Sequence, residues 1–63
     1  MVVYEVKVLF NNGAIIYHKN IRRINFTTDN ILELDAPDEN KCYIYLREYI
    51  YSVECEYKEK EMK

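Results

Sequence analysis

The chain has 63 residues, of which 49% are hydrophobic and 32% are charged, and its formal net charge is −2. This length allows one domain with a thin core, the apolar fraction argues against intrinsic disorder, and the near-balanced charge disfavours general nucleic-acid binding, which leaves a basic surface. No apolar run approaches the roughly 20 residues of a membrane-spanning helix, and we expect a cytoplasmic protein without a signal peptide.

Residues 2–10 alternate in the pattern of a half-buried strand. The expected inward face holds Val2, Tyr4, Val6, Val8 and Phe10. Asn12-Gly13 then predicts a two-residue type I′ turn, because both central residues of that turn need a positive φ. The resulting cross-strand pairs are Phe10 with Ile15, Val8 with Tyr17 and Lys7 with His18.

The second strand covers residues 14–19, and its alternation slips at Lys19-Asn20-Ile21. One inserted residue swaps the two faces of a strand, so the slip predicts a bulge or a sharp bend there. The next hairpin has two possible registers. A two-residue loop would set Phe26 opposite Glu33, whereas a loop of Thr28, Asp29 and Asn30 sets Phe26 opposite Leu32.

We favour the three-residue loop, because it opposes apolar side chains and sets Arg23 against Asp35 on the outer face. It requires Asn30 to adopt the left-handed conformation, which asparagine tolerates. A polar turn follows at residues 36–41, which contain the only proline.

Residues 42–57 read as two alternating strands separated by Arg47-Glu48-Tyr49. This corner lacks Gly, Pro and Asn, which favours a short 3₁₀ turn over a tight hairpin. The inward side chains are expected to be Cys42, Ile44, Leu46, Tyr51, Val53 and Cys55. The outward ones are expected to be Tyr43, Tyr45 and Ile50. We predict a domain over residues 1–57, followed by a charged, frayed tail at 58–63.

No residue pattern in the chain indicates catalysis, a cofactor or a metal. His18 lacks a spaced partner and is expected at the surface, opposite Lys7. Cys42 and Cys55 do not have metal-ligand spacing. A plain hairpin would oppose the two cysteines and permit a disulfide, whereas a corner separates them, so we expect free and mostly buried thiols.

Five short strands with a 3₁₀ turn before the last one resemble the SH3-like and Sm-like small β-barrels. The resemblance covers residues 2–57 and implies an all-β, five-stranded, antiparallel, partly open barrel. Sm-like proteins carry a glycine in their second motif, where this chain has Leu46-Arg47-Glu48-Tyr49. We therefore transfer no binding residues, and a shared superfold does not determine function.

Apolar side chains on the outward parity suggest where a partner binds, because contiguous exposed apolar surface marks interaction sites. These residues are Val3, Leu9, Ile16, Tyr43, Tyr45 and Ile50. We predict a non-enzymatic module that binds another protein or associates with itself. Abundant Ile, Tyr, Asn and Lys indicate an A/T-rich genome, and hence a phage- or plasmid-encoded modulator of a host protein in a low-GC bacterium.

The alternative function is binding of RNA or DNA by a small barrel. It would use the basic cluster at Lys19, Arg22 and Arg23 as phosphate contacts, with exposed tyrosines as stacking platforms. Without such a role, the same cluster is a solvated corner in which Arg23 pairs with Asp35.

Overall fold

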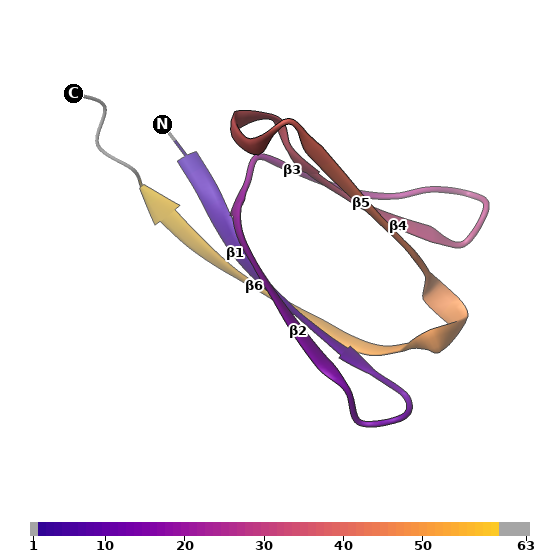
Figure 1. The fold of residues 1–63 in the computed structure, drawn as a ribbon. Helices are drawn as coiled ribbons and strands as arrows, with labels where there is room; N and C mark the ends of the chain where they lie inside the picture. Colours follow the sequence, from indigo (N-terminus) through magenta and orange to yellow (C-terminus); the bar gives the residue numbers. More distant parts are fainter. Residues whose placement is uncertain (1, 60–63) are drawn as a thin grey trace.

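The computed structural model describes residues 2–59, and in this range the protein is all-β (Figure 1). The elements are β1 (Val2–Phe10), β2 (Ile15–Ile21), β3 (Arg23–Phe26), β4 (Ile31–Ala36), η1 (Pro37–Glu39), β5 (Lys41–Leu46), η2 (Arg47–Tyr49) and β6 (Ile50–Glu59), where η marks a 3₁₀ turn. The strands form two three-stranded antiparallel sheets, β2-β1-β6 and β3-β4-β5. No helix among the described residues is long and apolar enough to cross a membrane.

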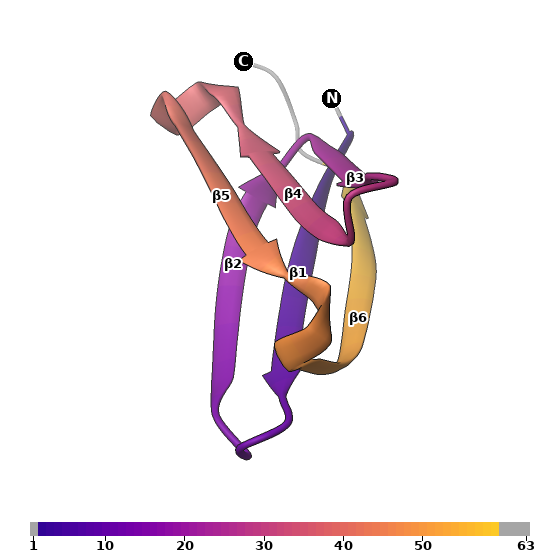
Figure 2. The same cartoon turned by 90° about the vertical axis from the view of Figure 1, so that its right-hand side faces the viewer.

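Two corners join the sheets, one at Arg22 between β2 and β3 and one at η2 between β5 and β6 (Figure 2). The predicted 3₁₀ turn at Arg47–Tyr49 is therefore confirmed. The predicted count of five strands is wrong, because the chain leaves the first sheet at Arg22 and enters the second as a separate strand. The two sheets do not close into a barrel.

The β3–β4 hairpin has the predicted register, with Phe26 opposite Leu32 and Arg23 opposite Asp35. The amide of Thr27 donates to the carbonyl of Ile31, and Asn30 has a φ of 61°. The expected left-handed asparagine is thus confirmed. The reason is that only this register opposes apolar residues along the whole inner face.

The β1–β2 hairpin differs from its prediction by one residue. Leu9 lies opposite Ile15, and Val6 lies opposite His18. The amide of Phe10 donates to the carbonyl of Ala14, and only Gly13 of the turn has a positive φ, at 90°. The loop therefore has three residues and a single left-handed position, as in the β3–β4 hairpin, and is not a type I′ turn.

The predicted slip in the second strand is confirmed as a bulge. Tyr4 pairs with Ile21 whereas Val6 pairs with His18, so β2 holds one residue more than β1 over this interval. Asn20 lies in the extra stretch with a φ of 60°. The bulge turns Ile21 into the core, where it is fully buried.

The core lies between the two sheets and consists of small and branched aliphatic residues. Its fully enclosed members are Val6, Val8, Ile21, Leu32, Leu34 and Ala36. In β5 the predicted faces are inverted: Tyr43 and Tyr45 pack against this core, whereas Cys42, Ile44 and Leu46 are exposed. Tyr45 lies opposite Leu32 and Tyr43 opposite Leu34, so the β4 register fixes which face of β5 turns inward.

The face predicted for β6 is also partly wrong. Its register against β1 shifts between Leu9 and Phe10, which leaves Tyr51 as an extra residue. Ile50 and Val53 pack on the core, whereas Tyr51 and Cys55 are exposed. The strand continues to Glu59, so the predicted domain boundary after residue 57 lies within β6; of the predicted tail, residues 60–63 lie outside the described range.

Candidate functional site

His18 lies in the seam between β2 and β5 and is not a surface residue as predicted. Its side chain is 8% exposed. Its Nε2 lies 2.7 Å from Oη of Tyr45, and the centroid of its ring lies 4.2 Å from that of Tyr43. The one-residue change in hairpin register moves His18 opposite Val6, onto the inner face of β2.

Burial lowers the pKa of His18 below its ordinary value of 6.5, and the nearby carboxylate of Glu39 opposes that shift. Burial also raises the pKa of Tyr45. Both groups are therefore neutral at neutral pH and share one hydrogen bond. This hydrogen bond links β2 to β5 across the seam.

The outward residues predicted from the sequence do not form one patch. Val3 is 4% exposed, and Tyr43, Tyr45 and Ile50 pack against the core. Tyr43, Tyr45 and Ile50 do not face outward as predicted, because the β5 face is inverted and the β6 bulge turns Ile50 inward; Val3 is buried outside this core cluster and so is not part of an exposed patch. Leu9 is half-buried, and Ile16 is exposed.

Exposed aromatic surface instead gathers at a groove between the end of β3 and the start of β6, which we call the corner groove. It has a volume of about 250 Å³. The residues that line it are Phe26, Arg47, Ile50, Tyr51, Ser52 and Val53. Phe26 is 52% exposed and Tyr51 is 75% exposed, and the guanidinium of Arg47 lies 5.0 Å from the centroid of the Phe26 ring.

The fold explains why the groove is open. β3 and β6 are edge strands of different sheets, and no backbone pairing joins them. Phe26 lies on the inner face of β3, opposite the buried Leu32, but it is the last residue of that short strand. Tyr51 is the bulged residue of β6. Both aromatic rings therefore reach the rim of the core without being enclosed by it.

Arg47 also lines a second hollow, where η2 meets the β3–β4 loop. Its amide donates to the carbonyl of Asn30 at 2.8 Å, which joins η2 to the β3–β4 loop. The hollow is lined by Asp29, Asn30, Leu46, Arg47 and Glu48. Arg47 thus stands between an aromatic groove and a polar hollow, with its own position held by the backbone.

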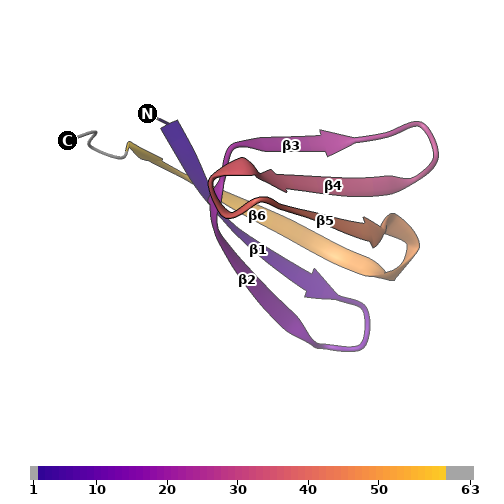
Figure 3. The same ribbon diagram turned by 45° about the horizontal axis from the view of Figure 1, so that its top comes forward.

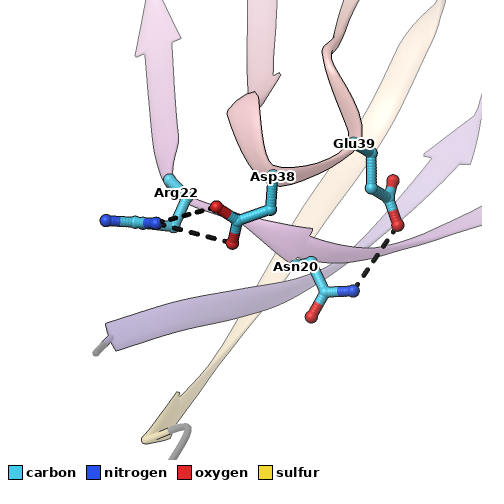
Figure 4. A network of polar contacts seen from close by, with 4 residues as sticks. All are labelled: Asn20, Arg22, Asp38 and Glu39. Carbon is cyan, nitrogen blue, oxygen red and sulfur yellow. Dashed lines mark hydrogen bonds and ion pairs between the residues drawn. The ribbon is translucent and has the colours of Figure 1, made fainter. Parts of the chain in front are cut away.

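The predicted basic cluster is largely neutralised within the chain. Nη1 of Arg22 lies 3.1 Å from Oδ1 of Asp38, and Nη2 of Arg23 lies 3.1 Å from Oδ2 of Asp35. The predicted Arg23–Asp35 pair is thus confirmed. Figure 4 shows Arg22 held by Asp38, with Asn20 hydrogen-bonded to Glu39 beside it. The contacts of Arg22 and Asn20 tie the Arg22 corner to η1, whereas Arg23 pairs with Asp35 of β4 and its side chain stays 76% exposed.

Cys42 and Cys55 are free thiols on different sheets, as the corner prediction requires, but both are exposed and not buried as expected. Cys42 is on the outward face of β5 with Ile44 and Leu46, whereas Cys55 lies opposite the buried Val6 and is nevertheless exposed. Partial burial still raises the pKa of Cys55. No group of three or more His, Cys, Asp or Glu side chains within residues 2–59 is placed to hold a metal ion.

Sequence reasoning missed the corner groove, because Tyr51 was expected to close the core and Phe26 was expected only as the cross-strand partner of Leu32. The position of Phe26 directly before a turn was the available signal, since a strand end is poorly covered. Comparison with family models, curated proteins and solved structures finds no match to this chain.

Proposed function

We propose that the chain is a non-enzymatic protein-binding module whose partner docks on the corner groove. The observation that carries this proposal is the exposed Phe26–Arg47–Tyr51 group at an unpaired seam. Tyrosine, phenylalanine and arginine are enriched at protein interfaces, and Tyr and Arg dominate binding energies there. A hollow between rigid strands also presents these side chains at low entropic cost.

The lining chemistry indicates the kind of partner. An apolar side chain would fill the space between Phe26 and Tyr51. No ion pair of Arg47 is found among the described residues, so its guanidinium can also meet a carboxylate of the partner while it stacks on Phe26. We propose a protein segment that carries an apolar residue next to an acidic one.

Three finer expectations belong to the same proposal. The element order and the 3₁₀ turn before β6 support an opened variant of the SH3-like arrangement. Free thiols support a cytoplasmic location, and the A/T-rich residue usage supports an origin in a phage or plasmid. We do not extend the proposal to nucleic acids, because Arg22 and Arg23 are already paired with carboxylates.

The test compares two tyrosines of similar exposure. Tyr51 lines the corner groove, whereas Tyr17 lies on the outer face of β2 and is 70% exposed. A partner is first isolated with the wild-type protein, and its affinity for the Tyr51→Ala and Tyr17→Ala variants is then measured by calorimetry. We expect Tyr51→Ala to weaken binding roughly tenfold or more, and Tyr17→Ala to leave it unchanged.

Arg47→Ala provides a second measurement on the same groove. We expect it to weaken binding and to reduce the salt dependence of the affinity, because the charge-assisted contact is lost. Equal affinities of wild type and both groove variants would refute the proposed site. A loss of affinity confined to Tyr17→Ala would place the interface on the outer face of the sheet β2-β1-β6, away from the groove.

A further inference from the structure

The outer end of β6 is a sheet edge that extends, together with the start of β1, beyond the sheet β3-β4-β5 (Figure 3). β6 is the last strand of the sheet β2-β1-β6, and β1 is its one hydrogen-bonded neighbour within the described residues. Figure 3 shows the start of β1 and the end of β6 running out beyond the sheet β3-β4-β5. Such an edge presents unpaired backbone N–H and C=O groups, which can pair with another strand.

The charges on this segment restrict how it can pair with itself. In a two-fold antiparallel pair of β6 strands, side chains of the same face must lie opposite each other, so one residue lies on the two-fold axis opposite its own copy. The residue before it in one copy then lies opposite the residue after it in the other copy. If the axis passes through a charged residue, that residue lies opposite its own copy; this applies to Glu54, Glu56, Lys58 and Glu59. If the axis passes through Cys55, Glu54 of one copy lies opposite Glu56 of the other. Like charges directly opposite one another are destabilising.

Centring on Tyr57 avoids every such conflict within Glu54–Glu59. Glu56 then lies opposite Lys58 of the second copy, and the reciprocal pair forms across the axis. Cys55 lies opposite Glu59 of the second copy. Every other centre in this segment opposes like charges, so the projecting half of β6 is complementary to itself in one register.

The same register relieves an unfavourable contact inside one molecule. Glu5 and Glu56 are directly opposite each other on β1 and β6. Lys58 lies beside them, with Nζ 3.0 Å from Oε1 of Glu56, and both carboxylates raise its pKa. Lys58 of a second copy would extend the row Glu5–Glu56 with a cation on the side of β6 that faces away from β1.

The inner face of the projecting ribbon adds an aromatic row. Tyr4 and Tyr57 are opposite each other, with ring centroids 6.3 Å apart in an edge-to-face arrangement, and Tyr57 is 58% exposed. The Tyr57-centred register sets the two Tyr57 rings side by side, flanked by the two Tyr4 rings. Aromatic cross-strand pairs are among the stabilising ones in sheets.

We propose that the protein forms a two-fold dimer in which β6 pairs antiparallel with β6 of a second copy, centred on Tyr57. The two sheets become one continuous sheet in the order β2-β1-β6-β6-β1-β2. The described residues that pair in this register are residues 55–59, and none of them lines the corner groove, whose β6 residues are Ile50, Tyr51, Ser52 and Val53. Dimerisation therefore does not depend on the proposed partner site, and either can fail alone.

The first test is a charge exchange followed by analytical ultracentrifugation over a range of protein concentrations. Glu56→Lys removes the Glu5–Glu56 conflict within one chain but opposes the introduced ammonium group to Lys58 across the axis. We expect the dimer dissociation constant to rise roughly tenfold. Folding stability is expected to change little, because the variant loses the Glu56–Lys58 ion pair within the chain but gains an opposite charge across from Glu5. The double variant Glu56→Lys with Lys58→Glu restores opposite charges across the axis, and we expect its dissociation constant to return close to that of the wild type.

The second test maps the register by disulfide formation. In a background with Cys42→Ser and Cys55→Ser, Tyr57→Cys places two thiols on the axis, whereas Glu56→Cys places each thiol opposite Lys58 of the second copy. Mild oxidation is expected to cross-link Tyr57→Cys much faster than Glu56→Cys. Three results would each overturn the proposal: a wild type that stays monomeric at every concentration, a dimer dissociation constant that the charge exchange does not change, or equal rates of cross-linking for the two cysteine variants.

Discussion

Nε2 of His18 and Oη of Tyr45 lie 2.7 Å apart and join the edge of one sheet to the edge of the other. The contact connects β2 with β5, which share no backbone pairing in the described residues. Phe10 packs edge-to-face on the same tyrosine, with centroids 5.5 Å apart. One phenol thus takes part in both the hydrogen bond and the aromatic packing on this side of the core.

Tyr45→Phe removes the hydroxyl and leaves Nε2 of His18 without its partner in a nearly enclosed position. We expect a loss of about 1 kcal/mol in the free energy of unfolding, measured by urea denaturation. Tyr43→Phe is the matched control, because Tyr43 contacts His18 through its ring. A Tyr43→Phe variant as destabilised as Tyr45→Phe would contradict the assigned hydrogen bond.

Stability is expected to depend on pH through His18. Its pKa is lowered on folding, so in the window between the folded pKa and the ordinary value of 6.5 the unfolded chain binds more protons. The stabilisation that comes from neutral His18 is therefore fully present above pH 6.5. It declines as the pH falls below 6.5, until His18 is also protonated in the folded protein.

The measurement is the free energy of unfolding of wild type and His18→Gln from about pH 8 to about pH 5. The difference between the two curves isolates the imidazole, because the other titratable groups are shared. We expect the wild type to lose stability relative to the variant as the pH falls. Parallel curves throughout this range would show that His18 titrates equally in both states.

Asn30 provides a test of the hairpin geometry, since its φ is 61°. Asn30→Ala places alanine in the left-handed region, which alanine tolerates less well than asparagine because it has no polar side chain to form a local hydrogen bond. We expect the free energy of unfolding to fall by about 1 kcal/mol. Asn30→Gly relieves that constraint and is expected to be close to neutral. The comparison uses urea denaturation, and equal destabilisation by Ala and Gly would rule out backbone strain as the cause.

Leu34 and Leu46 form a matched pair on neighbouring strands, with 0% and 48% of their surfaces exposed. Leu34→Ala is expected to cost roughly 2–5 kcal/mol of unfolding free energy, because it leaves a cavity between the sheets. Leu46→Ala should stay within about 0.5 kcal/mol. A larger effect at Leu46 than at Leu34 would mean that β5 presents the opposite face to the core.

The two hairpins show what a sequence can and cannot predict. In the β3–β4 hairpin, a shift by one residue would oppose Phe26 to a glutamate, so side-chain chemistry selects one register. In the β1–β2 hairpin, Val8 meets an apolar residue in either register, Tyr17 or Ile16, so the chemistry does not discriminate. The Asn12-Gly13 turn preference was then the main signal, and Gly13 serves a three-residue loop equally well.

The corner residues were predictable, but the choice of buried face in β5 was not. Alternation shows that Tyr43 and Tyr45 share one face and that Ile44 and Leu46 share the other. It does not show which of two apolar faces is enclosed. That choice depends on the pairing of β5 with β4 and on the hydrogen bond to His18, and both are contacts between distant parts of the chain.

The pairing of β1 with β6 also affects how the protein can fold during synthesis. β1 runs between β2 and β6, so the central strand of its sheet lacks one neighbour until the last strand of the described chain has been made. A nascent chain would leave the ribosome as a β1–β2 hairpin followed by the β3-β4-β5 sheet, with Val6 and Val8 incompletely covered. Pairing β6 with β1 closes the long loop formed by all the chain between these two strands. Forming such a distant contact slows folding and leaves the intermediate exposed to aggregation.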